Sequence, residues 1–438
     1  MLKNIYKDLI NVKTIKIVGG GWEMKEKDII LTDILGAAIR NREFNFEKYK
    51  SGSINWSDIY AEASAHQVHT LIYPIIKKLD SQIGPNATLM ARWNISVISC
   101  GAQMICDEVW LGEVIEALDN AKIQTMVLKG MAVNKCYPYP ELRTMGDADI
   151  LVHESDIDGA TEILRELGYI AEKDQKTKHI EFFKKNSISI ELHRLLIDYD
   201  FMRNKESFHT EIWESPVEIN IGMAKAKALS WEMQVLHLCL HMAAHITYGG
   251  FGLRQLCDLV MVVEKKIEQI NWDIIVDKAI YYGVEQFVFA IFTVCNNLFN
   301  MEVPSAILNM NNVSKEKVDE LIEDIFLSGA FGKKDMKRSA ANVLVNNSNV
   351  AKDLEDKNNF SKAVRILFPT REMMAKRCKY LYVKKNPMLL PFAWIHRIVY
   401  GLVRKDFDYD DKKALFKDNE LNKIAMERNY LLEWLGLK

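Results

Sequence analysis

The run 145–152, with the sequence MGDADILV, constrains the fold of this chain more than any other segment. Apolar residues in it alternate with Asp147 and Asp149, which predicts a strand rather than a surface turn. A strand advances about 3.3 Å per residue, so the two carboxylates project from one face, about 6–7 Å apart. Burying both carboxylates without a cation would be costly. The spacing suits divalent cations about 3.5–4 Å apart, as in phosphoryl and nucleotidyl transfer.

A second alternating strand, residues 188–193, supplies a third acid. Its polar face carries Glu191 and His193, while the intervening residues are apolar. We therefore predict that Asp147, Asp149 and Glu191 are the metal ligands and catalytic residues. His193 would orient Glu191 or cap the strand, and His179, which begins the preceding strand, would reach the same pocket.

A short apolar strand, residues 123–128, ends at Lys129 and Gly130 and runs into a helix-like segment, 131–137. Glycine permits close backbone approach, and a helix start offers free N–H groups to an anion. Lys129 adds a mobile positive charge. These features predict a phosphate-binding turn just ahead of the acidic strand.

These segments together resemble the poorly characterised bacterial nucleotidyltransferase-like family of the DNA polymerase β superfamily. The resemblance is sharpest over residues 123–195 and rests on Lys129-Gly130, Tyr137-Pro138, Arg143 and the runs 147–152 and 190–193. It implies a nucleotidyltransferase palm that uses Mg²⁺, or Mn²⁺ in its place, and a nucleoside triphosphate as substrate. Met131 departs from the superfamily pattern, which usually has Gly or Ser there.

Several polar residues outside the palm strands have more than one interpretation. A predicted helix carries His237, His241 and His245 on one face. These histidines would form a metal site, lie in the interior, or contact the nucleotide or the acceptor. The resemblance favours nucleotide contact for His245 and Arg254. Arg254 would bind phosphate or bridge to Asp258. Arg143 would neutralise triphosphate charge or lie at the surface.

The turn-forming residues that separate the predicted elements indicate an α+β fold that is predominantly helical. A small mixed β-sheet forms the nucleotidyltransferase palm and is flanked by N- and C-terminal helical regions. The expected parts are an arm at 1–21, ending in three glycines, helices at 22–120, the palm at 121–225 and helices at 226–438.

Composition indicates a cytoplasmic protein with no membrane association. Of the residues, 49% are hydrophobic and 26% are charged, and the net charge of −2 gives no global attraction to nucleic acid or anionic lipid. The seven cysteines are scattered and lack a Cys-x-x-Cys pair, which indicates a reducing compartment. The longest apolar stretch, 387–403, is too short and polar to span a bilayer.

The predicted function is Mg²⁺-dependent, pyrophosphate-releasing transfer of a nucleoside monophosphate to an acceptor. A small-molecule acceptor is slightly favoured over RNA because the chain has no global basic charge. The basic, aromatic segment 360–405 would bind RNA or form the solvated edge of a helical bundle. Alternatives are a catalytically decayed nucleotide-binding regulator, a toxin-like enzyme that modifies tRNA, and a helical scaffold. The oligomeric state stays open.

Overall fold

The structure is a computed structural model, and it describes most of the chain outside the first 23 residues. The described residues are 24–49, 54–80, 83–171, 179–196, 199–309, 314–332, 334–347, 368, 371, 374, 380, 382–403 and 419–438. The expected arm at 1–21 and much of the basic segment at 360–405 lie outside these ranges. Each described helix is too short or too polar to cross a lipid bilayer.

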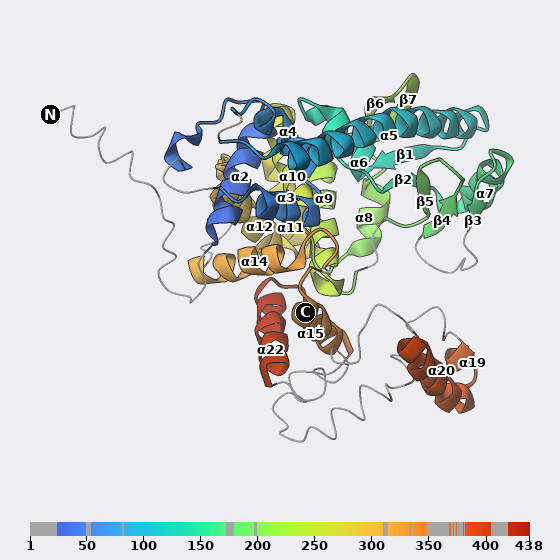
Figure 1. The fold of residues 1–438 in the computed structure, drawn as a ribbon. Helices are drawn as coiled ribbons and strands as arrows, with labels where there is room; N and C mark the ends of the chain where they lie inside the picture. Colours follow the sequence, from blue (N-terminus) through green and yellow to red (C-terminus); the bar gives the residue numbers. More distant parts are fainter. Residues whose placement is uncertain are drawn as a thin grey trace.

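Five strands form the mixed sheet that the sequence predicts, so the α+β fold class is confirmed (Figure 1). In the spatial order β1-β2-β5-β4-β3, the central pair β2/β5 is parallel and the other three pairs are antiparallel. The strands are β1 (Thr125–Leu128), β2 (Asp147–Val152), β3 (Ile170–Ala171), β4 (His179–Phe183) and β5 (Ser189–His193). A tight turn joins β4 to β5, and Asn186 in this turn has φ 58°.

A separate hairpin, β6 (Val217–Ile221) and β7 (Ala224–Ala228), follows the five strands of the sheet. Its β7 strand packs beside β1 without joining the five-stranded sheet. The turn residue Gly222 has φ 57°, in the left-handed region where glycine is favoured. The expected palm boundary at 225 would fall inside β7, and the division into regions stays a prediction.

Helices make up most of the rest of the chain and lie on either side of the strands in sequence. Before β1 they are α2 (Glu26–Ala38), α3 (Trp56–Ala65), α4 (His69–Ile76) and α5 (Ala87–Asn120). Among the strands they are α6 (Lys129–Val133), α7 (Ile157–Glu166) and α8 (Lys205–Glu211). After β7 they are α9 (Trp231–Tyr248), α10 (Leu253–Lys266), α11 (Trp272–Tyr282), α12 (Glu285–Phe299), α13 (Ser305–Leu308), α14 (Lys315–Ser328), α15 (Met336–Asn347), α19 (Tyr382–Lys385), α20 (Leu390–Val403) and α22 (Asn419–Trp434).

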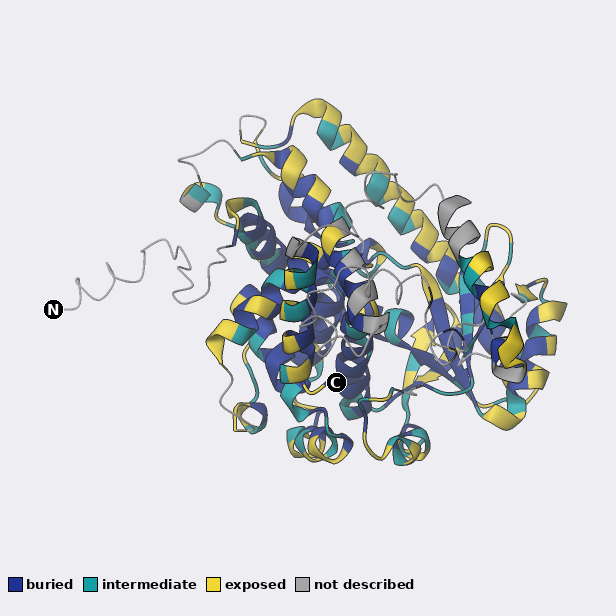
Figure 2. Cartoon of the chain, turned by 90° about the horizontal axis from the view of Figure 1, so that it is seen from below, coloured by how far each residue is buried: buried dark blue, intermediate teal, exposed yellow. Residues whose placement is uncertain are grey.

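The main hydrophobic core runs from the sheet into α9, α10 and α12, which pack against one another (Figure 2). Residues on all sides of α9 and α10 are buried, because these two helices pack against each other and against α6 and α12. A second, small cluster holds α19 and α20 together apart from this core. The sheet therefore shares one hydrophobic core with the helices that follow it.

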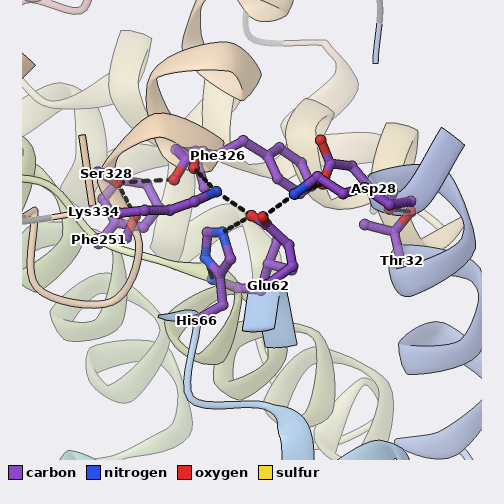
Figure 3. A network of polar contacts seen from close by, with 11 residues as sticks. Asp28, Thr32, Glu62, His66, Phe251, Phe326, Ser328 and Lys334 are labelled. Atoms are coloured by element: carbon purple, nitrogen blue, oxygen red, sulfur yellow. Dashed lines mark hydrogen bonds and ion pairs between the residues drawn. The ribbon is translucent and has the colours of Figure 1, made fainter. Parts of the chain in front are cut away.

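A buried carboxylate, Glu62 on α3, joins the N-terminal helices to the turn after α14 (Figure 3). It forms ion pairs with Lys27 and Lys334, and its Oε1 lies 3.1 Å from Nε2 of His66. The backbone N–H of Leu253 donates to Nδ1 of His66 at 3.2 Å. The imidazole is therefore the neutral tautomer with its proton on Nε2, and it links Glu62 to the start of α10.

We expect Glu62→Ala to lower the free energy of unfolding by about 3–5 kcal/mol, because it leaves buried cationic and imidazole partners without their acceptor. Chemical denaturation followed by circular dichroism measures this change. Glu116→Ala, an exposed glutamate on α5, is the matched control and should stay within about 0.5 kcal/mol of the wild type. Equal stability of the two variants would contradict the role given to Glu62.

Candidate active site

Three carboxylates gather on one face of the central strand pair. Asp147 and Asp149 occupy alternate positions of β2 and so share a face. The parallel register places Glu191 of β5 directly beside Asp149. Partial desolvation, followed by the charge of Asp149, raises the pKa of Asp147 to about 6. The acidic residues chosen from the sequence therefore meet in space.

Asp149 is the buried member of this group and is held by the side chains of Lys129 and His193. Its Oδ1 lies 2.8 Å from Nζ of Lys129 and 2.9 Å from Nε2 of His193. Burial opposes ionisation of Asp149, but these two neighbours outweigh burial and hold its pKa below the ordinary value. The carboxylate is therefore ionised.

Lys129 reaches Asp149 because of the backbone at the end of β1. Leu128 pairs with Asp149 across β1 and β2, and Lys129 follows at φ 44°, in the left-handed region. That conformation is costly for a residue with a side chain and is typical of functional sites. The helix α6 begins at Lys129 itself, two residues earlier than the sequence predicts.

Gly130 follows Lys129 and is closely surrounded by other side chains. A Cβ atom on it would stand 3.2 Å from Sδ of Met145 and 3.4 Å from Nη1 of Arg143. The absence of a side chain therefore lets the start of α6 pack against the loop that precedes β2. This packing keeps the expected phosphate-binding turn next to the acidic strand.

Two histidines add nitrogen donors beside Glu191. Nε2 of His193 lies 3.3 Å from Oε2 of Glu191, and Nε2 of His179 lies 3.9 Å from Oε1 of the same residue. The two histidines pair across β4 and β5, so their rings share the acidic face. One ligand atom from each of His179, Glu191 and His193 falls within 4.8 Å of the others, close enough to surround one metal ion.

The histidine face of α9 closes the site on the side of Lys129. Nε2 of His241 lies 3.2 Å from Nζ of Lys129 and 3.1 Å from Nε2 of His245. An ammonium can only donate, so His241 accepts through Nε2 and is neutral. Burial and the charge of Lys129 lower the pKa of His245 to about 4 and that of His237 to about 3. These imidazoles add hydrogen-bonding capacity without positive charge.

The two arginines selected from the sequence have protein partners. Arg143 is buried, and its Nε and Nη2 donate to Oδ1 and Oδ2 of Asp258 at 2.7 and 2.6 Å. Tyr137 also donates to Asp258, at 2.7 Å. The bridge to Asp258 considered for Arg254 is therefore made by Arg143, and nothing in the sequence pattern indicated this pairing.

Arg254 is less buried than Arg143 and contacts the loop that precedes β2. Its Nη1 donates to the side chain of Gln67 and, at 3.3 Å, to the carbonyl oxygen of Thr144. Its Nε is buried and has no hydrogen-bond partner among the described residues. This donor stays available for a ligand, whereas the donors of Arg143 that face Asp258 do not.

We expect Arg143→Met and Asp258→Asn each to reduce the free energy of unfolding by about 3 kcal/mol, because each leaves the other buried charge without its partner. The double variant should lose clearly less than the sum, since both halves of the pair are then removed. A double-mutant cycle from denaturant titrations measures this coupling. Arg165→Met, at an exposed pair on α7, is the control and should cost about 0.5 kcal/mol or less. Additive losses would show that the pair is not coupled.

A family described as an uncharacterised nucleotidyltransferase has a model that matches residues 52–300. Among solved structures, an antigenic nucleotidyltransferase-like protein from Paracoccidioides brasiliensis is similar to this chain at 15% identity. That match covers 36% of this chain and 76% of the other, with a TM-score of 0.27. The curated proteins contain no match to the chain. The family match spans every residue of the acidic site.

Proposed function

Since the chain belongs to the family of uncharacterised nucleotidyltransferases, we propose that it transfers a nucleoside monophosphate from a nucleoside triphosphate to an acceptor. The observation that carries the proposal is the convergence of Asp147, Asp149 and Glu191 on one face of β2 and β5. Catalysis of this transfer depends on positioning and charge stabilisation more than on covalent chemistry by the protein. The site contains residues suited to both.

The donor set fits a hard divalent cation. Three carboxylates stand against one permanent cation, Lys129, with His193 as a second, titratable one. Carboxylate oxygens are the ligands that Mg²⁺ prefers. Asp147 and Asp149 would hold Mg²⁺ there, and the ion would supply positive charge that stabilises the departing pyrophosphate.

The protein's own residues would orient the triphosphate. Lys129 and the start of α6 lie next to Asp149 and would bind phosphate oxygens through the ammonium and backbone N–H groups. The buried Nε of Arg254 offers a further donor. Arg143 would act indirectly, because its pair with Asp258 and its proximity to Gly130 hold the turn in place.

In the reaction, an acceptor oxygen attacks the α-phosphorus, and the bond to the oxygen that bridges the α- and β-phosphorus breaks. Pyrophosphate leaves with the electron pair, and the acceptor's proton passes to a carboxylate or to solvent. Burial raises the pKa of Glu191, but the hydrogen bond from His193 and the charges of Lys129 and His179 together lower the pKa overall. Glu191 is therefore a weak base, which favours its role as a ligand.

The acceptor is a small molecule or RNA, and the net charge of −2 supports the small molecule. Incubation with each α-labelled triphosphate, with small-molecule and RNA acceptors in parallel, would identify the pair. A decayed, nucleotide-binding regulator would bind triphosphate without releasing pyrophosphate. A toxin-like enzyme would label tRNA and arrest growth on expression.

We expect Asp149→Asn and Asp147→Asn each to lower the rate of pyrophosphate release by at least about 100-fold. Each substitution removes a negative charge that would hold the divalent cation at the site. Asp147 is exposed, so its variant should keep the wild-type melting temperature even where Asp149→Asn does not. Asp158→Asn, at an exposed aspartate on α7, is the matched control and should retain full activity. Unchanged turnover in Asp147→Asn and Asp149→Asn would refute the proposal.

The nitrogen donors beside Glu191 should make the site prefer Mn²⁺ to Mg²⁺, because imidazole binds transition metals better than Mg²⁺. We expect His179→Gln to weaken Mn²⁺ binding by about 10-fold while Mg²⁺ binding changes by less than about 2-fold. Electron paramagnetic resonance titration with Mn²⁺, followed by competition with Mg²⁺, measures both affinities. His153→Gln, outside the cluster, is the control, and an equal loss for both metals would contradict a nitrogen ligand.

A further inference from the structure

The long helix α5 carries an apolar stripe that faces away from the protein. Ile95, Ile98, Ile105 and Val109 are 69%, 70%, 64% and 53% exposed. With the two exposed alanines between and before them, they form what we call the α5 seam: Ala91, Ile95, Ile98, Ala102, Ile105 and Val109. The seam extends about 27 Å along the helix. Figure 2 shows exposed residues along this helix at the rim of the molecule.

The spacing of the seam is that of a helix–helix contact. Its residues follow one another at intervals of four, three, four, three and four, which is the heptad pattern of a coiled coil. The opposite face of α5 is already buried in the core through Trp93, Met104 and Leu111. The helix thus has two apolar faces, and only one of them is covered by the described residues.

The order of residues in the seam is complementary to its own reverse. When a second copy of α5 runs antiparallel with the two-fold axis level with residue 100, each position number and its opposite number sum to 200. Ala91 then faces Val109, Ile95 faces Ile105, and Ile98 faces Ala102. Two of these layers place a small residue against a larger one, so the space between the two helices is filled at a constant separation. A parallel pair would instead place alanine against alanine and leave voids.

The flanking residues also favour the antiparallel arrangement. A parallel pair would bring Glu108, which already pairs with Lys135, next to the partner subunit's Glu113, a second acid that offers it no hydrogen-bond donor. The antiparallel pair places Glu108 beside the partner subunit's Asn94, which can donate a hydrogen bond to a carboxylate. Ser99 meets its own counterpart near the axis. Charge and shape therefore favour the same orientation.

We propose that the protein binds a second copy of itself through the α5 seam, with the two helices antiparallel and the two-fold axis at the level of residue 100. The seam lies on exposed positions of α5, whereas the acidic site lies on β2 and β5. The proposal therefore stands independently of the proposed catalytic activity.

Sedimentation equilibrium of the full chain tests the association. The wild type should have twice the chain mass of 50.5 kDa, and Ile98→Glu combined with Ile105→Glu should have the mass of one chain. Ile280→Glu replaces an isoleucine of α11 that is 54% exposed, and this matched control should stay dimeric. A monomeric wild type, or a double variant that stays dimeric, would overturn the proposal.

Disulfide cross-linking tests the orientation, in a Cys106→Ser background that removes the exposed native thiol. Ser99→Cys should form a disulfide with its counterpart, because both residues lie beside the axis. Ala91→Cys should not, since its counterpart lies about 27 Å away along the pair. Cross-linking of Ala91→Cys but not of Ser99→Cys would overturn the antiparallel arrangement, and the background without either substitution should stay uncross-linked.

Discussion

The carboxylate of Asp149 is the point at which four parts of the molecule meet. Lys129 reaches it from the junction of β1 and α6, and His193 reaches it from β5. Through Lys129 the same group contacts His241 on α9. An unpaired charge at this depth would cost several kcal/mol, so the strands, the turn and the helix must take up these positions together. The need to neutralise one buried charge thus orders the site.

The parallel pairing of β2 and β5 turns this local requirement into a three-carboxylate cluster. Glu191 lies beside Asp149 because the two strands pair in one register. A slip of one residue would turn Glu191 to the opposite face, where Ile190 and Leu192 now pack in the core. Core packing therefore fixes the position of the acid. This is why alternation in the sequence sufficed to predict which three carboxylates lie together.

Contacts between distant residues could not be predicted in the same way. Arg254 and Asp258 are four residues apart, the usual spacing of a helical ion pair, yet Asp258 binds Arg143, 115 residues away. The β6–β7 hairpin was missed because β7 consists of alanine and lysine, which rarely form strands. The hydrogen-bonded pairing with β6 stabilises β7 as a strand although its residues do not favour one. In both cases the fold overrides a rule about near neighbours.

The length of α5 has a mechanical consequence for the site. This single helix of 34 residues packs against α4 near its beginning and against β7 and α7 farther along. A continuous helix bends only gently, so it acts as a strut that locks the sheet to the helical body. Rotation of the sheet relative to α4 would therefore require this helix to bend.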